Sequence, residues 1–393
     1  MKPRAVALLL AGSMIALLAR GAVAGECAAL PSPIYVTGST AAKPLLAEIG
    51  RLMAAQTPPV TVVYLGQGSC TGVDAILSGT PIMGPGLSTW DINGAESKCD
   101  ITSPSGVVAH VGISDVFANT CFQLPGGLPA SVADVLGPVQ AMTFVTHRSS
   151  TEKAISAEAA YYVYGFGALS QVPPWTFEAS IFRRDAFSGT QAMIAAAIGV
   201  PSERWKGTAT TSSGDLVTRL GAANFPDQSI GILSAEVAQE NRSTIKVLAY
   251  QNFSQSCAVF PDSAESANDK ANVRGGQYPI WGPLHLFVRI NSSGYPVNAK
   301  AGEIIGYLAG TRPAPSGLDL VRIEALRHAV PQCAMRVRRM QEMGPAMPFA
   351  PVGACGCYYE RVATGSTNCK TCTASAECPP GAPVCSYGYC EAQ

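Results

Sequence analysis

The segment Ile34-Tyr35-Val36-Thr37-Gly38-Ser39-Thr40 carries a run of β-branched and aromatic residues into a turn of small residues. A run of this kind, bounded by glycine, is typical of a buried strand. After the turn, apolar residues recur at the spacing of one helical face. These are Leu45, Leu46, Ile49 and Leu52. The segment therefore predicts a strand over residues 34–37, a turn of Gly, Ser and Thr, and a helix.

The same order of strand, hydroxyl-bearing turn and helix recurs twice. The turns are GQGSCTG over residues 66–72 and RRDAFSGT over residues 183–190. The first residues of a helix have unpaired N–H groups and a partial positive charge, so a helix start can hold an anion. Capping by Ser or Thr explains any one of these turns alone. Three in one chain, one of them with the pair Arg183-Arg184, favour an anion site.

Strand-like and helix-like runs alternate from about residue 31 to residue 330. This alternation predicts an α/β fold in which helices cover the sheets. The predicted strands are 34–37, 60–65, 107–113, 142–146, 178–183, 230–233, 245–250 and 284–290.

The charge balance limits the classes of partner. The chain of 393 residues has 27 Lys and Arg against 27 Asp and Glu, so its formal net charge is zero. Nucleic-acid binding usually needs a basic excess, and we therefore expect no nucleic-acid partner. The four histidines lack metal-ligand spacing. No nucleophile motif accompanies Ser188. We expect a binding protein without a metal or cofactor, and not an enzyme.

The first 24 residues have the pattern of a secretion signal. Lys2 and Arg4 precede a short apolar run over residues 5–19, and Ala22-Val23-Ala24 is a small-residue cleavage site. The apolar run is too short to span a membrane comfortably. We expect cleavage after Ala24, a secreted periplasmic or extracellular protein, and no membrane span in the mature chain.

The chain has 13 cysteines, which after a signal peptide are expected to form disulfides. The odd count leaves at least one thiol free or paired between chains. Cys70 is expected to pair with either Cys121 or Cys99. Residues 336–354 predict a linker. Residues 355–393 predict a tail held by disulfides, because that stretch cannot form a conventional core.

Several motifs resemble the periplasmic phosphate-binding proteins of ABC importers, in the type 2 periplasmic binding superfamily. The resemblance runs from about residue 34 to residue 309. It rests on GSTA (38–41), GQGSCTG (66–72), VGISD (111–115) and Arg184 followed by SGT (188–190). It implies two α/β lobes with hinge crossovers, plus the disulfide-rich tail. Lobe one would be 26–138 and 283–335, and lobe two would be 139–282.

The resemblance also implies a site between the lobes for phosphate or a similar oxyanion. Asp115 would accept a hydrogen bond from a protonated phosphate oxygen, which sulfate lacks, and would thereby select phosphate. The implied ligand-binding residues are Ser39, Thr40, Ala41 through its N–H, Ser69, Asp115, Arg184, Ser188, Gly189 and Thr190.

The chain departs from the family in its third loop. The usual loop reads Arg, any residue, Asp, Gly, Ser, Gly, Thr, and here Ala186 and Phe187 replace the Asp and the Gly. The carboxylate that normally braces the arginine is therefore missing, and Asp185 is the candidate replacement. Residues 79–105 form an insertion relative to the family.

Two functions follow as hypotheses. In the first, the chain binds phosphate for uptake, and its partner is an ABC permease. In the second, the chain is a cell-surface or matrix interaction protein that keeps a degenerate phosphate-binding scaffold and uses the cysteine-rich tail.

Overall fold

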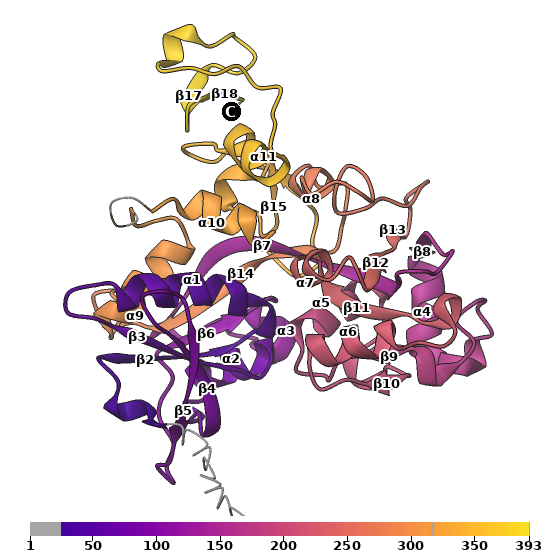
Figure 1. Cartoon of the computed structure of the whole chain (residues 1–393), viewed down its shortest axis with the longest axis horizontal. Coiled ribbons are helices and arrows are strands. Elements are labelled where there is room, and N and C mark those ends of the chain that lie inside the picture. Colours follow the sequence, from indigo (N-terminus) through magenta and orange to yellow (C-terminus); the bar gives the residue numbers. More distant parts are fainter. Residues whose placement is uncertain (1–24, 314, 316–317, 393) are drawn as a thin grey trace, which may run out of the picture.

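The computed structural model describes residues 25–313, 315 and 318–392 (Figure 1). The predicted signal peptide, residues 1–24, lies outside the described residues. Within them, no helix has both the length and the apolar character needed to cross a membrane.

A mixed sheet of ten strands connects the whole body of the molecule. Its order is β1-β5-β4-β3-β2-β6-β14-β7-β11, and β12 also pairs with β7. The strands are β1 (Gly25–Glu26), β2 (Pro33–Gly38), β3 (Thr61–Gly66), β4 (Gly84–Trp90), β5 (Glu96–Ile101), β6 (Val111–Ser114), β7 (Val132–His147), β11 (Gly231–Ser234), β12 (Ile245–Val247) and β14 (Trp281–Arg289).

The long strand β7 runs from one half of the molecule into the other, antiparallel to β14 (Figure 1). The pairing extends from Trp281 opposite Ala141 to Arg289 opposite Val132, with a register shift between Pro283 and His285. These two strands pass through the predicted lobe boundaries. They are therefore the structural candidates for the hinge crossovers.

The first half of the molecule packs helices α1 (Lys43–Ala54), α2 (Ser69–Leu77) and α9 (Ala299–Leu308) on its strands. Successive residues of a strand point to opposite faces. Accordingly, Leu286 packs in one core with α1 and α9, while its neighbour Phe287 packs in another with α2. The predicted helical face of α1 is buried at all four positions, Leu45, Leu46, Ile49 and Leu52.

The second half of the molecule has its own core under four helices. They are α4 (Ala157–Phe166), α5 (Gly189–Ile198), α6 (Ser213–Gly221) and α7 (Ala235–Glu240). Two parallel strand pairs lie at its edge, β8 (Ala154–Ser156) with β13 (Ala249–Gln251), and β9 (Phe182–Arg183) with β10 (Thr208–Ala209). In Figure 1 this half lies to the right of α3 (Ala118–Cys121).

Several predicted strands differ in extent from the observed ones. Over 178–183 only Phe182–Arg183 is a strand, because Glu178–Ser180 forms a 3-10 turn in which the Ile181 N–H bonds to the Glu178 carbonyl. Over 107–113 the strand begins at Val111, because Val107 instead exchanges backbone bonds with Ile82. The predicted strand 245–250 divides at Leu248 into β12 and β13, which pair with different strands.

The C-terminal part rises from the body as α10 (Leu320–Leu326), a short pair β15 (Val337–Arg338) and β16 (Met347–Pro348), α11 (Gly356–Thr364) and the hairpin β17 (Val384–Ser386) with β18 (Tyr389–Glu391) (Figure 1). The remaining short elements are α8 (Ala271–Arg274) and 3-10 turns at Cys27–Ala29, Thr40–Ala42, Gly167–Ser170, Ser202–Arg204, Pro226–Gln228, Gln332–Ala334 and Ser375–Glu377.

Disulfides join the cysteines as predicted for an oxidising compartment. Cys70 pairs with Cys121, one of the two expected partners. Cys257 is unpaired and exposed among the described residues. The other pairs are Cys27–Cys99, Cys333–Cys355, Cys357–Cys369, Cys372–Cys385 and Cys378–Cys390. Three disulfides therefore lie within the tail, and Cys333–Cys355 ties it to the body.

Candidate functional site

The first predicted turn places Ser39 at the start of a helical segment that continues into α1. The Ser39 hydroxyl accepts a hydrogen bond from the Ala41 N–H at 3.2 Å and donates one to Asp115 Oδ1 at 2.5 Å. The Tyr64 hydroxyl donates to the Ser39 carbonyl. Gly38 is required here because its φ is +129° and a Cβ would lie 1.9 Å from the Ile113 carbonyl oxygen. The turn is therefore pressed directly against strand β6.

The second turn brings Ser69 to the same carboxylate. The Ser69 hydroxyl donates to Asp115 Oδ2 at 3.0 Å and accepts from the Asp115 N–H at 3.1 Å. Ser69 does not cap this helix. Gly68, with φ +110°, is the N-cap of α2 and no side chain caps that helix start. The Ser69 hydroxyl both donates to and accepts from Asp115, and it makes no hydrogen bond to the backbone of α2.

Asp115 follows β6 and lies where the first two helix starts meet. It is 4% exposed, and Ser39 and Ser69 are fully buried. Burial raises the pKa of Asp115, and the hydroxyls of Ser39 and Ser69 and the charge of Arg184 oppose that rise. A desolvated carboxyl is easier to protonate, so either Asp115 or a bound anion can hold a shared proton.

The third turn approaches Asp115 from the other half of the molecule. The Ser188 hydroxyl caps α5 by accepting from the Gln191 N–H at 3.5 Å. A Cβ built on Gly189 would lie 2.1 Å from Ser69 Oγ and 2.7 Å from Asp115 Oδ2. Only glycine therefore allows this close approach. The Cys70 N–H also donates to the Phe187 carbonyl at 3.3 Å, which links the second and third turns directly.

Arg184 is 3% exposed and brings a cation to the site. Its Nη1 donates to the Ser213 hydroxyl at 2.9 Å, while Asp185 Oδ2 lies 3.9 Å from Nη2. Arg184 Nε is buried without a hydrogen-bond partner among the described residues. Burial lowers the pKa of Arg184, and the Asp185 carboxylate leads the charges that oppose this. Ser213 and not Asp185 therefore makes the close contact that positions the guanidinium.

The predicted site residues do not all take part in these contacts. No hydrogen bond among the described residues joins Thr40 or Thr190 to Asp115. The Ala41 N–H, predicted to face an anion, is bonded to Ser39. Sequence reasoning missed Tyr64, Gln140 and Ser213. Gln140 of β7 reaches the Ala41 carbonyl with its Nε2 at 3.5 Å.

The arrangement can bind an anion through converging hydrogen-bond donors. Three serine hydroxyls, the first N–H groups of α5 and one guanidinium are the donor types that oxyanions favour. Ser39 and Ser69 presently donate to the Asp115 carboxylate, so these hydroxyls already hold one oxygen-bearing group. Both halves of the molecule supply donors, so a bound anion would bridge them.

Other reactive groups lie apart from this site. His110 Nδ1 accepts from the Tyr35 N–H at 3.0 Å, and burial lowers its pKa. Three sulfur atoms, those of Cys372, Cys378 and Cys390, lie within 4.8 Å of one another. All three belong to disulfides, which explains their proximity.

Solved structures provide the comparison with known proteins. A substrate-binding protein of Clostridium perfringens, assigned to a phosphate ABC transporter and crystallised with bound phosphate, matches at 13% identity and a TM-score of 0.52, covering 76% of this chain and 99% of that one. An ABC-type phosphate transport receptor from Vibrio cholerae matches at 14% identity and a TM-score of 0.50, covering 76% of this chain and 100% of that one. No protein-family model and no curated protein sequence matches the chain. The structural likeness confirms the predicted type 2 periplasmic-binding-protein fold.

Proposed function

We propose that the chain is a solute-binding protein that holds phosphate between its two halves. The observation that supports this most directly is the meeting of Ser39, Ser69 and Asp115 from one half with Gly189 from the other. Arg184 adds a buried cation to that junction. In this proposal the lobes are residues 26–138 with 283–335, and residues 139–282.

Phosphate would be held by an exchange of hydrogen bonds. The hydroxyls of Ser39 and Ser69 would turn from the Asp115 carboxylate to phosphate oxygens, while Ser188 and Arg184 would donate from the second lobe. The Asp115 carboxylate would then accept the proton of a monoprotonated phosphate. Fully ionised sulfate would leave two acceptors facing each other, which costs binding free energy.

The proposed site also includes the residues that follow its contacts in the chain. These are Thr40 and Ala41 after Ser39, and Thr190 after Gly189. The Ala41 N–H is available to an anion once the Ser39 hydroxyl turns away. Opening of the lobes about β7 and β14 would admit the ligand, because Gly189 lies directly against Ser69 and Asp115 in the present arrangement.

Further observations fit this role. The fold is shared with the Clostridium perfringens protein, whose crystal structure holds bound phosphate. Disulfides form and persist outside the cytosol, which supports a periplasmic or extracellular location. An ABC permease is the proposed partner, and the proposed role is binding without catalysis.

Substitution of Asp115 by Asn tests the proposed selectivity. Asn keeps the size of the side chain and can donate to sulfate. We expect the D115N variant to bind phosphate about tenfold or more weakly and to lose the preference over sulfate. Isothermal titration of the purified chain with each anion measures both affinities.

The matched control is Asp185→Asn, which removes one negative charge near Arg184 without touching the Ser39–Asp115–Ser69 contacts. It should change the affinities for phosphate and sulfate in parallel. Failure of the unmodified chain to bind phosphate at millimolar concentration would contradict the proposed function.

A further inference from the structure

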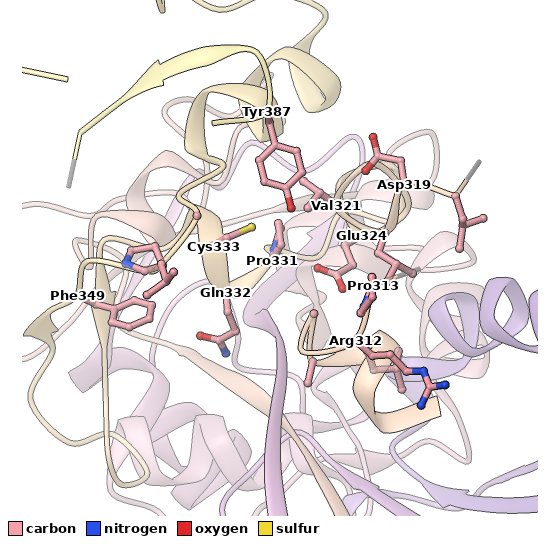
Figure 2. A pocket seen from close by; sticks show the side chains of 18 residues that line it. Arg312, Pro313, Asp319, Val321, Glu324, Pro331, Gln332, Cys333, Phe349 and Tyr387 are labelled. Carbon is pink, nitrogen blue, oxygen red and sulfur yellow. The ribbon is translucent and has the colours of Figure 1, made fainter. Parts of the chain in front are cut away.

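A cavity lies between the body and the cysteine-rich tail, and none of the residues of the proposed phosphate site line it (Figure 2). Its volume is about 540 Å³, within the range of sites for small organic ligands. Apolar side chains form much of its wall. They include Leu308, Val321, Pro331, Phe349 and Val352, and the tail adds Tyr387.

A buried carboxyl group projects into this cavity. Glu324 of α10 is 4% exposed, and Figure 2 shows its carboxyl group directed toward the space between Pro331 and Pro313. Among the described residues, no group donates a hydrogen bond to this carboxyl and no cation pairs with it. An unpartnered buried carboxyl is costly, and such groups in native proteins usually have a ligand or a functional role.

The charged residues that line the cavity beside Glu324 interact with other groups. The Asp319 carboxylate caps α10 through the Arg322 N–H at 2.9 Å and accepts from the Tyr358 hydroxyl. Arg312 pairs with Glu303 at 3.6 Å. Burial raises the pKa of Glu324 well above its usual range, and the Asp319 charge raises it further. The Asp319 charge beside Glu324 therefore disfavours an anion at this position.

We propose that this cavity binds a small organic ammonium ion. The ammonium group would donate to the Glu324 carboxylate, and the apolar part of the ligand would pack on Phe349 and Val352. The proton held by Glu324 in the unliganded chain would pass to solvent on binding. A bare metal ion fits less well, because the Asp319 carboxylate, which also lines the wall, is already hydrogen-bonded to the Arg322 N–H and the Tyr358 hydroxyl. The proposal does not depend on phosphate binding.

One residue of the cysteine-rich tail, Tyr387, lines the cavity. Tyr387 lies at the turn of the β17–β18 hairpin and stacks on Tyr358 of α11, with ring centroids 5.5 Å apart. Three disulfides fix the tail, and the Cys333–Cys355 disulfide joins the cavity wall at Cys333 to the start of the tail. The tail therefore contributes Tyr387 to the cavity wall.

The test uses 2-phenylethylammonium as the probe and 2-phenylethanol as its uncharged counterpart of similar size. Both are titrated into the purified full chain by calorimetry. The variant Glu324→Gln removes the charge with little change in shape. The control Glu342→Gln removes another carboxyl, whose Oε1 atom is buried and which does not line the cavity.

We expect saturable binding of the amine at millimolar concentration or below, and binding of the alcohol about tenfold or more weaker. The E324Q variant should lose about tenfold or more in amine affinity, and E342Q should stay within about twofold. Hydrogen exchange in the unmodified chain should slow over residues 320–333 when the amine is present. Absence of saturable amine binding, equal binding of amine and alcohol, or equal affinity in E324Q would each overturn the proposal.

Discussion

Asp115 is the residue on which the proposed selectivity depends. Both of its carboxylate oxygens accept hydroxyl hydrogen bonds, from Ser39 at 2.5 Å and from Ser69 at 3.0 Å. Its backbone N–H is bonded as well. Three interactions hold a buried group that burial alone would disfavour in its charged form. The carboxyl is therefore fixed in position for a ligand that can share one proton with it.

The raised pKa of Asp115 predicts how sulfate binding varies with pH. A protonated Asp115 can donate to sulfate, and an ionised Asp115 cannot. Because burial raises the pKa above its usual value, the protonated form persists to higher pH, and sulfate affinity should fall as the pH rises through that pKa. The fall should approach about tenfold per pH unit. Titration with sulfate between pH 4 and about pH 8 measures it, and the D115N variant should give a flat profile over this range.

Gly189 makes a second prediction at the residue scale. In Gly189→Ala the new Cβ would lie 2.1 Å from Ser69 Oγ, so the two halves could not approach as closely. We expect phosphate affinity to fall about tenfold or more, since closure contributes to binding. Gly214→Ala in α6 is the matched control, because the nearest atom to its Cβ is Ser212 Oγ at 3.8 Å. Equal phosphate affinities of the two variants by calorimetry would argue against closure at Gly189.

The residues of the site differed in how far the sequence could predict them. Gly, Ser and Thr at a strand end predict a helix start, and this pattern located Ser39, Ser69 and Ser188. Tyr64 has no such pattern, because its role arises from a contact between segments distant in the chain. Ser213 does lie in a turn of Ser and Gly at the start of α6, but nothing in that turn indicates its contact with Arg184. The same limit explains Ser69, whose partner is Asp115 and not its own helix.

At the scale of elements, α2 depends on a cross-link. The Cys70–Cys121 disulfide joins its first turn to α3 over a separation of 51 residues. Loop entropy for this separation corresponds to about 4 kcal/mol. The helix start that presents Ser69 is thereby held against β6 and the third turn. Rigid placement of this start favours anion binding, because less conformational entropy is lost when the ligand arrives.

Removal of that disulfide tests its role. We expect the double variant C70A/C121A to lose roughly 2–4 kcal/mol of unfolding free energy and to bind phosphate more weakly. Urea unfolding followed by tryptophan fluorescence reports on the body, because all four tryptophans, at positions 90, 175, 205 and 281, lie outside the tail. The control C378A/C390A removes a tail disulfide and should leave this transition unchanged. A similar loss in both variants would show that the effect is not specific to α2.

Element boundaries were harder to predict than element types. The residues of β7 read as a strand only over 142–146, because Gly137 and Pro138 suggest a break. The strand continues through both residues, because pairing with β14 supplies hydrogen bonds on either side of the register shift. Tertiary pairing therefore determines the length of the hinge strand, and no local pattern shows it.

At the scale of the whole molecule, the C-terminal part is firmly joined to the hinge. Arg339, within the predicted linker, is 5% exposed and donates to the carbonyls of Trp281 at 2.9 Å and Pro279 at 3.0 Å. Its guanidinium lies over the Trp281 ring, 4.1 Å from the centroid. The segment 336–354 thus packs on the start of β14. Its Pro, Met and Gly content predicted a linker but gave no sign of this contact.

In the proposed function, phosphate binds where three helix starts from two halves of the chain meet. A crystal structure of the full chain grown with phosphate tests it most directly. We predict density for one phosphate in contact with Ser39, Ser69, Ser188 and Arg184, with one phosphate oxygen within hydrogen-bond distance of Asp115. A structure at saturating phosphate in which Ser39 and Ser69 still donate to Asp115, with no phosphate between the halves, would rule out phosphate binding at this site.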